Sequence, residues 1–191
     1  MLLAAFALRA PQANGAPEED SRKYTVMAAF LYNFLVFVEW PDVASFGQGP
    51  VLIGVLGDNP FGAAVEAITR KTIDDRPIEF RFFPDIHAVT PTHILFVPVD
   101  CNEELDALCG TLRGKPVLTV GESDDFTRRG GVIRFFEAEA GAGKTLRVEI
   151  NEAAAEAQGL KIRAKLMRLA SVVHYPAPAH ADQGGPRTAP P

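Results

Sequence analysis

The sequence predicts an α/β fold: a layered domain with a mixed, largely parallel sheet of about six strands, flanked by helices in a Rossmann-like arrangement. Three observations carry this prediction. Short apolar runs alternate with helical patterns between residues 51 and 120, two β-rich runs in 132–150 are joined by a Gly/Ala-rich segment, and residues 24–40 form a long apolar stretch. Alternating strands and helices give parallel pairing, whereas the joined runs give an antiparallel hairpin.

The long apolar stretch, residues 24–40, predicts a helix because its apolar residues recur at helical spacing. Pro41 is expected to end it, since the residue before a proline avoids the α conformation. Few polar residues interrupt the stretch, so the sheet, other helices or a second subunit must cover most of its sides. Five aromatic residues are therefore candidates for a partner or dimer surface, against the alternative that they fill the core: Phe30, Tyr32, Phe34, Phe37 and Trp40.

The remaining elements follow from the same patterns. Buried or β-rich runs predict strands at 51–56, 78–83, 93–97 and 116–120, and a hairpin at 132–136 and 145–150. Helical spacing predicts helices at 61–70, 102–112, 152–158 and 164–173. Asn151 is a suitable N-cap for the third of these helices, and Gly159 is a suitable residue to end it.

The two ends of the chain differ in composition from the domain predicted at residues 23–174. Residues 1–16 combine a short apolar run with small residues, and we expect them to be the remnant of a truncated signal peptide. Residues 176–191 are rich in Pro, Ala and Gly and are expected to be disordered. Export from the cytoplasm follows from the first of these expectations.

The charge balance argues against two classes of partner. Nineteen basic and 24 acidic residues leave a net charge of -5, which disfavours binding to nucleic acid. The sequence has no Lys/Arg run that would hold it to a membrane surface, and no segment long enough to insert into one.

The two cysteines, Cys101 and Cys109, are candidates for a disulfide or for redox-active thiols. An exported protein can form a disulfide. However, eight residues of helix rise roughly 12 Å, and a disulfide needs Cα atoms within about 7 Å. The pair can form only if Cys101 precedes the helix and the chain folds back, and two buried thiols are an equal alternative.

A candidate ligand crevice follows the first predicted strand, at Gly57, Asp58, Asn59 and Gly62. Open α/β sheets bind ligands at the carboxyl ends of their strands, where helix N-termini can hold anions. Asp58 would repel a phosphate. The simpler interpretation of these residues is a strand-to-helix turn that is capped by Asp58 or Asn59. Gly141–Thr145 lacks the first glycine of a phosphate-binding loop and joins two strands, which predicts a hairpin loop instead.

No catalytic, cofactor or metal site is expected. The four histidines have no metal-ligand spacing with each other or with the cysteines. The acidic cluster of Glu122, Asp124 and Asp125 could supply paired carboxylates, although such a cluster is more typical of a solvated loop. We therefore expect that the protein is not an enzyme, with dispersed catalytic groups as the alternative.

Four segments in order resemble the YfiR-like family of periplasmic regulators. They are Met27–Phe34 with Phe37, Trp40 and Pro41; Gly114–Gly121; Gly130–Phe135 leading to Val148–Asn151; and Gly159–Ile162 with Lys165, Leu166, Leu169 and Ala170. Together they span about residues 23–173. The sequence departs from the family pattern at Arg163 and Ala164, where paired serines often open the last helix, and in having fewer cysteines.

The resemblance implies an exported α/β domain, often dimeric, that binds the periplasmic region of a membrane-bound diguanylate cyclase and represses it, lowering cyclic-di-GMP and biofilm formation. A sensor kinase is an alternative partner, and cysteine redox state contributes to control in the family. Two rival functions stay open. The domain could bind a small molecule at the crevice near Gly57, or it could be an enzyme.

Overall fold

The computed structural model describes residues 16–41, 49–141 and 143–175 of the chain. The predicted signal-peptide remnant, apart from its last residue, and the predicted disordered tail lie outside these residues. In chain order the elements are α1 (Ala16–Phe37), β1 (Val38–Glu39), β2 (Val51–Leu56), α2 (Ala64–Thr69), β3 (Thr72–Ile73), β4 (Arg76–Phe83), η1 (Ile86–Ala88), β5 (Ile94–Val97), η2 (Val99–Glu104), α3 (Leu105–Leu112), β6 (Leu118–Gly121), β7 (Ile133–Ala140), β8 (Gly143–Asn151), α4 (Glu152–Ala157), β9 (Lys161–Ile162), α5 (Ala164–Met167) and β10 (Ser171–Val173).

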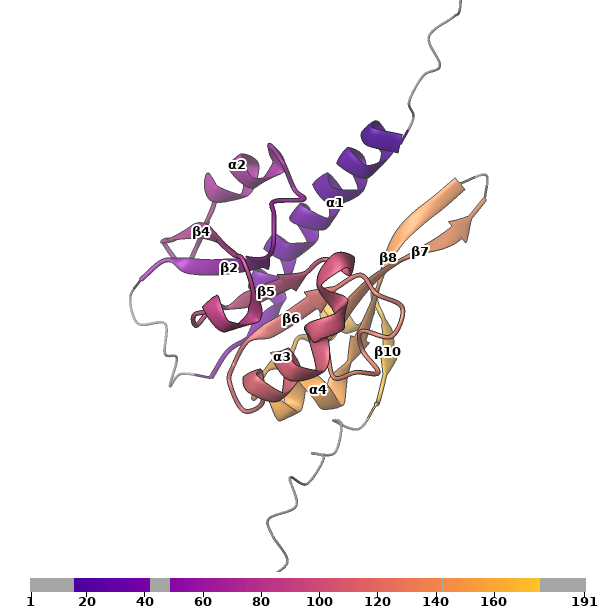
Figure 1. Ribbon diagram of the computed structural model, residues 1–191. Coiled ribbons are helices and arrows are strands. Elements are labelled where there is room, and N and C mark those ends of the chain that lie inside the picture. The colour runs from indigo at the N-terminus through magenta and orange to yellow at the C-terminus, as the bar shows by residue number, and fades with distance from the viewer. Residues whose placement is uncertain (1–15, 42–48, 142, 176–191) are drawn as a thin grey trace, which may run out of the picture.

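The main sheet contains eight strands in the order β10-β8-β7-β6-β5-β2-β4-β3 (Figure 1). All of its neighbouring pairs are parallel except β7 with β8 and β3 with β4. This confirms the predicted α/β fold with a mixed, largely parallel sheet. The two strands beyond the expected six are β3 and β10, which are short and lie at the two edges.

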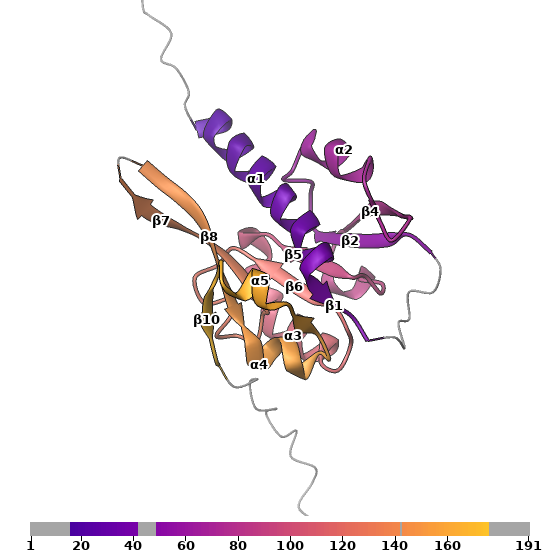
Figure 2. The ribbon, with the colours of Figure 1, turned by 180° about the vertical axis from the view of Figure 1, so that it is seen from behind.

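Helices cover both faces of the sheet. Figure 1 shows α3 in front of the strands, and Figure 2, seen from behind, shows α1, α5 and β1 on the opposite side. Residues of β5 alternate between the two faces: Ile94 and Phe96 belong to the α1 side of the core, whereas Leu95 and Val97 belong to the α3 side. A parallel strand that is buried on both faces needs this continuous apolar sequence. No helix in the described part is long and apolar enough to span a membrane.

The first helix begins earlier and ends earlier than predicted. It begins at Ala16. Glu18 and Glu19 lie in its first turn, where their negative charges stabilise the helix by interacting with the positive end of its dipole. It ends at Phe37 rather than Trp40, because Val38 and Glu39 pair with Ile162 and Lys161 in a separate two-stranded sheet. Tertiary pairing therefore ends the helix three residues before the position that Pro41 predicts.

The predicted last helix, 164–173, is wrong beyond its first turn. Helix α5 stops at Met167, and residues Ser171–Val173 form β10, which pairs in parallel with Glu149–Asn151 of β8. Leu166 is buried as expected, but Leu169, expected to face inward, is 67% exposed. The β-branched pair Val172 and Val173 suits an edge strand better than a helix.

Two other local predictions are confirmed, and the β7–β8 hairpin is longer than expected. The side chain of Asn151 accepts a hydrogen bond from the Ala154 N–H and caps α4, and Gly159 adopts a positive φ of 71° just after that helix. The hairpin of β7 and β8 continues to Ala140 and Gly143, well beyond its expected bounds. Its outer half projects from the body of the molecule (Figure 1).

Candidate functional site

The crevice expected at Gly57–Gly62 is a capped turn beside a small cavity. The Asn59 side chain accepts a hydrogen bond from the Phe61 N–H at 2.9 Å and donates one to the Gly62 carbonyl at 3.4 Å. Asp58 is exposed, and Gly57 and Gly62 have the positive φ angles that suit glycine in such a turn. A cavity of about 300 Å³ borders Gly62, with Pro60–Ala64 on one side and residues 20–25 of α1 on the other.

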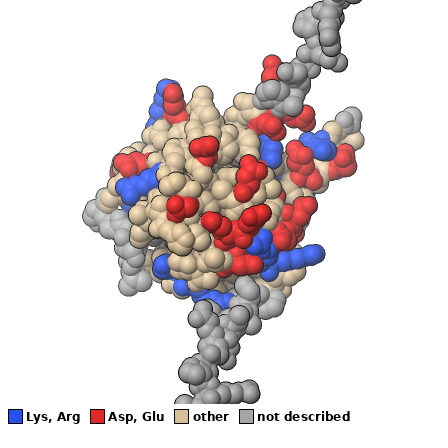
Figure 3. All heavy atoms as spheres, in the orientation of Figure 1, with Lys and Arg blue, Asp and Glu red and all other residues tan. Residues whose placement is uncertain are grey.

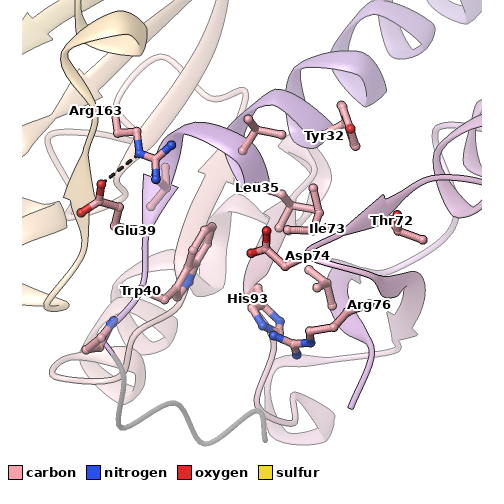
Figure 4. A pocket seen from close by; sticks show the side chains of 14 residues that line it. Tyr32, Leu35, Glu39, Trp40, Thr72, Ile73, Asp74, Arg76, His93 and Arg163 are labelled. Atoms are coloured by element: carbon pink, nitrogen blue, oxygen red, sulfur yellow. Dashed lines mark hydrogen bonds and ion pairs between the residues drawn. The ribbon is translucent and has the colours of Figure 1, made fainter. Parts of the chain in front are cut away.

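A larger hollow of about 770 Å³ lies at the opposite ends of the strands (Figure 4). It borders the first residues of β2 and β4 and the residue before β5, so it is at the amino ends of the parallel strands. The end of α1, β1, the β3–β4 turn and the residue before α5 complete its walls. Its lining residues are Tyr32, Leu35, Val36, Val38, Glu39, Trp40, Pro41, Val51, Thr72, Ile73, Asp74, Arg76, His93 and Arg163.

His93 lies on the floor of this hollow as a neutral imidazole. Its Nδ1 accepts a hydrogen bond from the Leu52 N–H at 3.0 Å, so the proton of the neutral ring is on Nε2. Burial, with a smaller contribution from the positive charge of Arg76, lowers the pKa of His93 from 6.5 to about 4. The ring therefore stays uncharged at neutral pH.

Trp40 stands beside His93, with ring centroids 5.8 Å apart in an edge-to-face arrangement. Its indole Nε1 is buried and has no hydrogen-bond partner in the part of the chain that the structure describes. A buried N–H without an acceptor lowers the stability of the folded protein by about 1–3 kcal/mol, so this position is locally destabilising. The indole and the ring of Tyr32 give the hollow two aromatic walls.

Charged groups of both signs surround the opening. The Arg163 guanidinium pairs with Glu39 at 2.9 Å across the junction of β1 and β9. Arg76 donates hydrogen bonds to the carbonyls of Gly49 and Pro50, at 2.7 and 3.3 Å, from the other side. Asp74 occupies the tight turn between β3 and β4. The hollow thus combines two guanidinium groups and a neutral imidazole with aromatic surface, which suits a small polar molecule with an apolar part.

Two of the three candidate carboxylates, Glu122 and Asp124, line one groove of about 310 Å³, and each carboxylate of the cluster pairs with a different cation. Glu122 accepts a hydrogen bond from the Tyr24 hydroxyl at 3.0 Å and pairs with Lys23, which ties the end of β6 to α1. Asp124 pairs with Arg134, and Asp125 pairs with Arg129. Burial, reinforced by the charge of Glu122, raises the pKa of Tyr24 above its ordinary value. Each carboxylate thus has its own cationic partner.

Both cysteines are free thiols, so the alternative of a disulfide is not realised in the structure. Cys109 is buried in the core on the α3 side, and Cys101 is half-buried beside that cluster. Burial and the charge of Asp106 raise the pKa of Cys109 to about 12, and burial raises that of Cys101 as well. Neither thiol has the low pKa of a reactive cysteine. Among the described residues, no cluster of His, Cys, Asp and Glu could hold a metal ion.

The five aromatic candidates for a partner surface are mainly core residues. Phe34 is fully buried and stacks on Phe135 at a centroid distance of 5.8 Å, so its place as a surface anchor was a wrong prediction. Phe30, Tyr32, Phe37 and Trp40 are half-buried and pack against the same core. Tyr32 and Trp40 are the two that line the large hollow.

Sequence reasoning missed the large hollow because its residues come from five separate stretches of the chain. Trp40, Arg76, His93 and Arg163 share no spacing that a motif could capture. The one local signal is the Asp74–Asp75 pair, whose two positive φ angles of 49° and 62° form the turn that closes β3 against β4.

A model of a protein family described as YfiR/HmsC-like matches residues 24–171. The matched range runs from α1 to the first residue of β10, and so covers the other seven strands of the main sheet and all residues that line the large hollow. No curated protein matches the chain.

Proposed function

The chain belongs to the YfiR/HmsC-like family, and from this membership we propose that it is a periplasmic regulatory protein that represses a membrane-bound diguanylate cyclase. A domain without catalysis can inhibit an enzyme by binding one of its conformations more tightly than the other. In this proposal the chain binds the periplasmic region of the cyclase in its inactive state and lowers the level of cyclic-di-GMP.

The family match is the observation that carries the proposal. The site geometry supports it indirectly, since Glu122, Asp124 and Asp125 each pair with a different cation. The two thiols are free, and both have raised pKa values. A binding role needs none of these groups to be reactive.

The projecting part of the β7–β8 hairpin is the surface that we propose for the partner. Strand β6 pairs with β7 only as far as Arg134, and β10 pairs with β8 only from Glu149 onward. Among the residues that the structure describes, the segments Phe136–Ala140 and Gly143–Arg147 thus pair only with each other. Their exposed charges include Glu137, Glu139 and Lys144, and Figure 3 shows acidic residues gathered on this side of the molecule.

The hairpin borders a groove that it shares with α1. A groove of about 310 Å³ separates it from α1, with Lys23 and Met27 on the helix side and Phe136, Glu137 and Leu146 on the hairpin side. A partner segment placed in this groove would contact both elements. Charged groups at such a rim chiefly determine specificity and the rate of association.

The test is capture of partners from solubilised membranes of the protein's own cell, followed by mass spectrometry. Recovery of a membrane-bound diguanylate cyclase supports the proposal, and recovery of a sensor kinase instead would replace the cyclase as partner. Deletion of the gene that encodes this chain should raise the cyclic-di-GMP concentration in the cell. A folded bait that captures no membrane protein above background, together with unchanged cyclic-di-GMP, would refute the proposal.

A matched pair of variants locates the surface. Glu137→Lys with Glu139→Lys reverses two charges on the hairpin and should weaken capture about tenfold or more. Glu103→Lys with Glu104→Lys makes the same change of net charge at exposed residues of η2 and should leave capture unchanged. Equal loss in both variants would mean that net charge, and not the hairpin, determines binding.

The large hollow favours a second candidate function, the binding of a small molecule that tunes the regulator. Arg76 and Arg163 line it together with Tyr32 and Trp40. A ligand that binds only the folded protein raises its melting temperature. We expect a panel of small aromatic and aliphatic carboxylates to include such a ligand, and Arg163→Met to abolish the shift. A panel without any shift would remove this candidate.

A further inference from the structure

A second cavity lies on the side of the sheet that α3 covers, and neither proposed function uses it. It measures about 240 Å³ and lies where α3 ends, beside the residues that precede β5 and β6 (Figure 1). Most of its lining residues come from two stretches of the chain, 86–91 and 111–117. It shares no lining residue with the large hollow, so mutations can separate the two sites.

Hydrogen bonds within the chain fix both walls of this cavity. On one side, the Asp85 carboxylate accepts hydrogen bonds from the N–H groups of His87 and Ala88, at 2.8 and 3.0 Å, and so holds η1. On the other side, the Lys115 N–H donates to the Leu112 carbonyl at 2.9 Å, just after the end of α3. A cavity with ordered walls loses little conformational entropy when it binds a ligand.

The surface inside the cavity is mainly apolar. Leu108, Leu112 and Val117 are buried in the core cluster on the α3 side, and Ile86 and Val89 pack against that cluster. Hydrocarbon placed against these side chains is removed from water, which is favourable. The cavity therefore suits the apolar part of a ligand.

The volume of the cavity limits the length of that apolar part. Pockets for drug-sized ligands have volumes of about 300–1,000 Å³, so this one suits a smaller molecule. At about 30 Å³ for each water-sized group, it holds about eight such groups. A methylene group is similar in size to a water molecule, so an unbranched chain of about six to eight carbons fills the space.

The charge at the cavity favours an anion at its rim. Among the described residues that line it, Lys115 is the only charged one, and no carboxylate lines it. Lys115 is exposed, and it has no ion pair with another residue of the described chain. An anionic group beside its ammonium would be attracted without repulsion from any lining residue.

We propose that this cavity binds a medium-chain carboxylate, with the hydrocarbon chain inside and the carboxylate at the rim beside Lys115. The orientation follows from two charges. The C-terminus of α3 carries a partial negative charge, which disfavours an anion against the end of the helix. The Lys115 ammonium compensates for it at the rim, where the carboxylate also keeps contact with water.

The test is calorimetric titration of the purified full chain with octanoate. In the series butanoate, hexanoate and octanoate, each added methylene should tighten binding about fourfold, because it leaves water for the cavity. Decanoate should gain less, since the cavity is then full. Octylamine, which has the opposite charge, should bind more weakly than octanoate. Absence of octanoate binding, or an affinity that does not depend on chain length, overturns the proposal.

A matched pair of variants tests the location. Thr111→Phe places a ring in the cavity from an exposed position on α3 and should abolish octanoate binding. Ala107→Phe introduces the same ring at an exposed residue of α3 that does not line the cavity, and should bind octanoate like the wild type. Circular dichroism of each variant separates a lost site from a lost fold. Equal binding by the two variants would overturn the assignment.

Lys115 variants test the proposed ion pair. Lys115→Met keeps the apolar stem and should weaken octanoate binding about fivefold, as expected for an exposed pair. Lys115→Glu should reverse the preference, so that octylamine binds more tightly than octanoate. Unchanged preference in Lys115→Glu would show that the carboxylate lies elsewhere and would overturn the proposed orientation.

Arg163→Met distinguishes this cavity from the large hollow, which Arg163 lines, and should leave octanoate binding unchanged. Binding that is lost in Arg163→Met and retained in Thr111→Phe would overturn the proposal and place the ligand in the large hollow. The inference does not depend on the regulatory proposal, because it requires no second protein and is measured on the purified chain.

Discussion

The two faces of the sheet are stabilised in different ways. On the α1 face, aromatic rings from distant segments contact one another: Phe34 stacks on Phe135, Phe30 meets Phe135 at 5.7 Å, and Phe61 meets Phe96 at 4.9 Å. This face carries the larger core cluster, with residues from α1, α2, α4 and α5. Its stability comes chiefly from the apolar area that these large side chains remove from water.

On the α3 face, one ring is enclosed by backbone. A Cβ atom added at Gly121 or at Gly131 would lie 2.3 or 2.2 Å from an atom of the Phe126 ring. A Cβ at Gly54, on the same face, would meet Phe83, Leu95 and Thr92 at 2.8 to 3.1 Å. This side of the core is smaller, and it depends on close fit.

The difference indicates which kind of mutation each face tolerates. A face that is stabilised by area loses most when a large side chain is removed. A face that is stabilised by fit also loses when a small side chain is enlarged. The predictions below test this contrast, in order of decreasing effect on the free energy of unfolding.

The largest effect is expected for Phe34→Ala on the α1 face. The ring is fully buried and contacts both Phe30 and Phe135, so its removal should lower the free energy of unfolding by about 3–5 kcal/mol. Urea denaturation measures this change. Val26→Ala on the same helix, at a residue 45% exposed, is the control and should have little effect. A loss below about 1 kcal/mol for Phe34→Ala would contradict burial as the source of stability on this face.

The second effect depends on pH and arises at the hollow beside α1. The pKa of His93 is about 4 in the folded protein and 6.5 in the unfolded chain. Between these values the unfolded chain binds more protons, so stability rises with pH from about 4 to 6.5 and falls as the solution is acidified. The full span corresponds to roughly 3 kcal/mol.

His93→Asn isolates this contribution. Asparagine can accept the hydrogen bond from the Leu52 N–H in place of Nδ1, but it does not titrate. Subtracting its unfolding free energy from that of the wild type at each pH should give a curve that rises between pH 4 and 6.5. The exposed His87→Asn gives the reference, and a flat difference curve for His93→Asn would disprove the assigned titration.

The third effect is an enlargement on the α3 face. Gly131→Ala should lower the free energy of unfolding by about 1–3 kcal/mol, because the new methyl group overlaps the ring of Phe126. Gly110→Ala is the matched control: Gly110 is exposed within α3, and a Cβ there meets nothing within 4 Å. It should stabilise the protein by up to about 1 kcal/mol through helix propensity. Equal responses at the two glycines would remove the contrast between the faces.

Periodicity and turn chemistry predicted the centre of the fold well and its margins poorly. Strand β2 was predicted with its observed bounds, and Asn151 and Gly159 limit α4 as expected, because buried runs and caps are encoded locally. Strands β1, β9 and β10 are short and depend on partners distant in sequence, so Val38 and Val172 gave signals typical of a helix. The Gly57 crevice was predicted from a general rule of α/β sheets, whereas the larger hollow depends on tertiary placement of Trp40 and Arg163.

The smallest effect is expected at the two cysteines of the α3 face. Cys109→Ala removes one buried sulfur and should cost about 1 kcal/mol, and Cys101→Ser, at a half-buried position, should change stability by less than about 0.5 kcal/mol. Their reactivity provides the sharper measurement. Raised pKa values leave few thiolates at neutral pH, so both thiols should react slowly with a thiol reagent in the native protein, with Cys101 ahead of Cys109. In denaturant both should react at the rate of a free cysteine. A native protein in which neither thiol reacts until a reductant is added would instead contain a disulfide, and the α3 face would then be held by a covalent bond as well as by close fit.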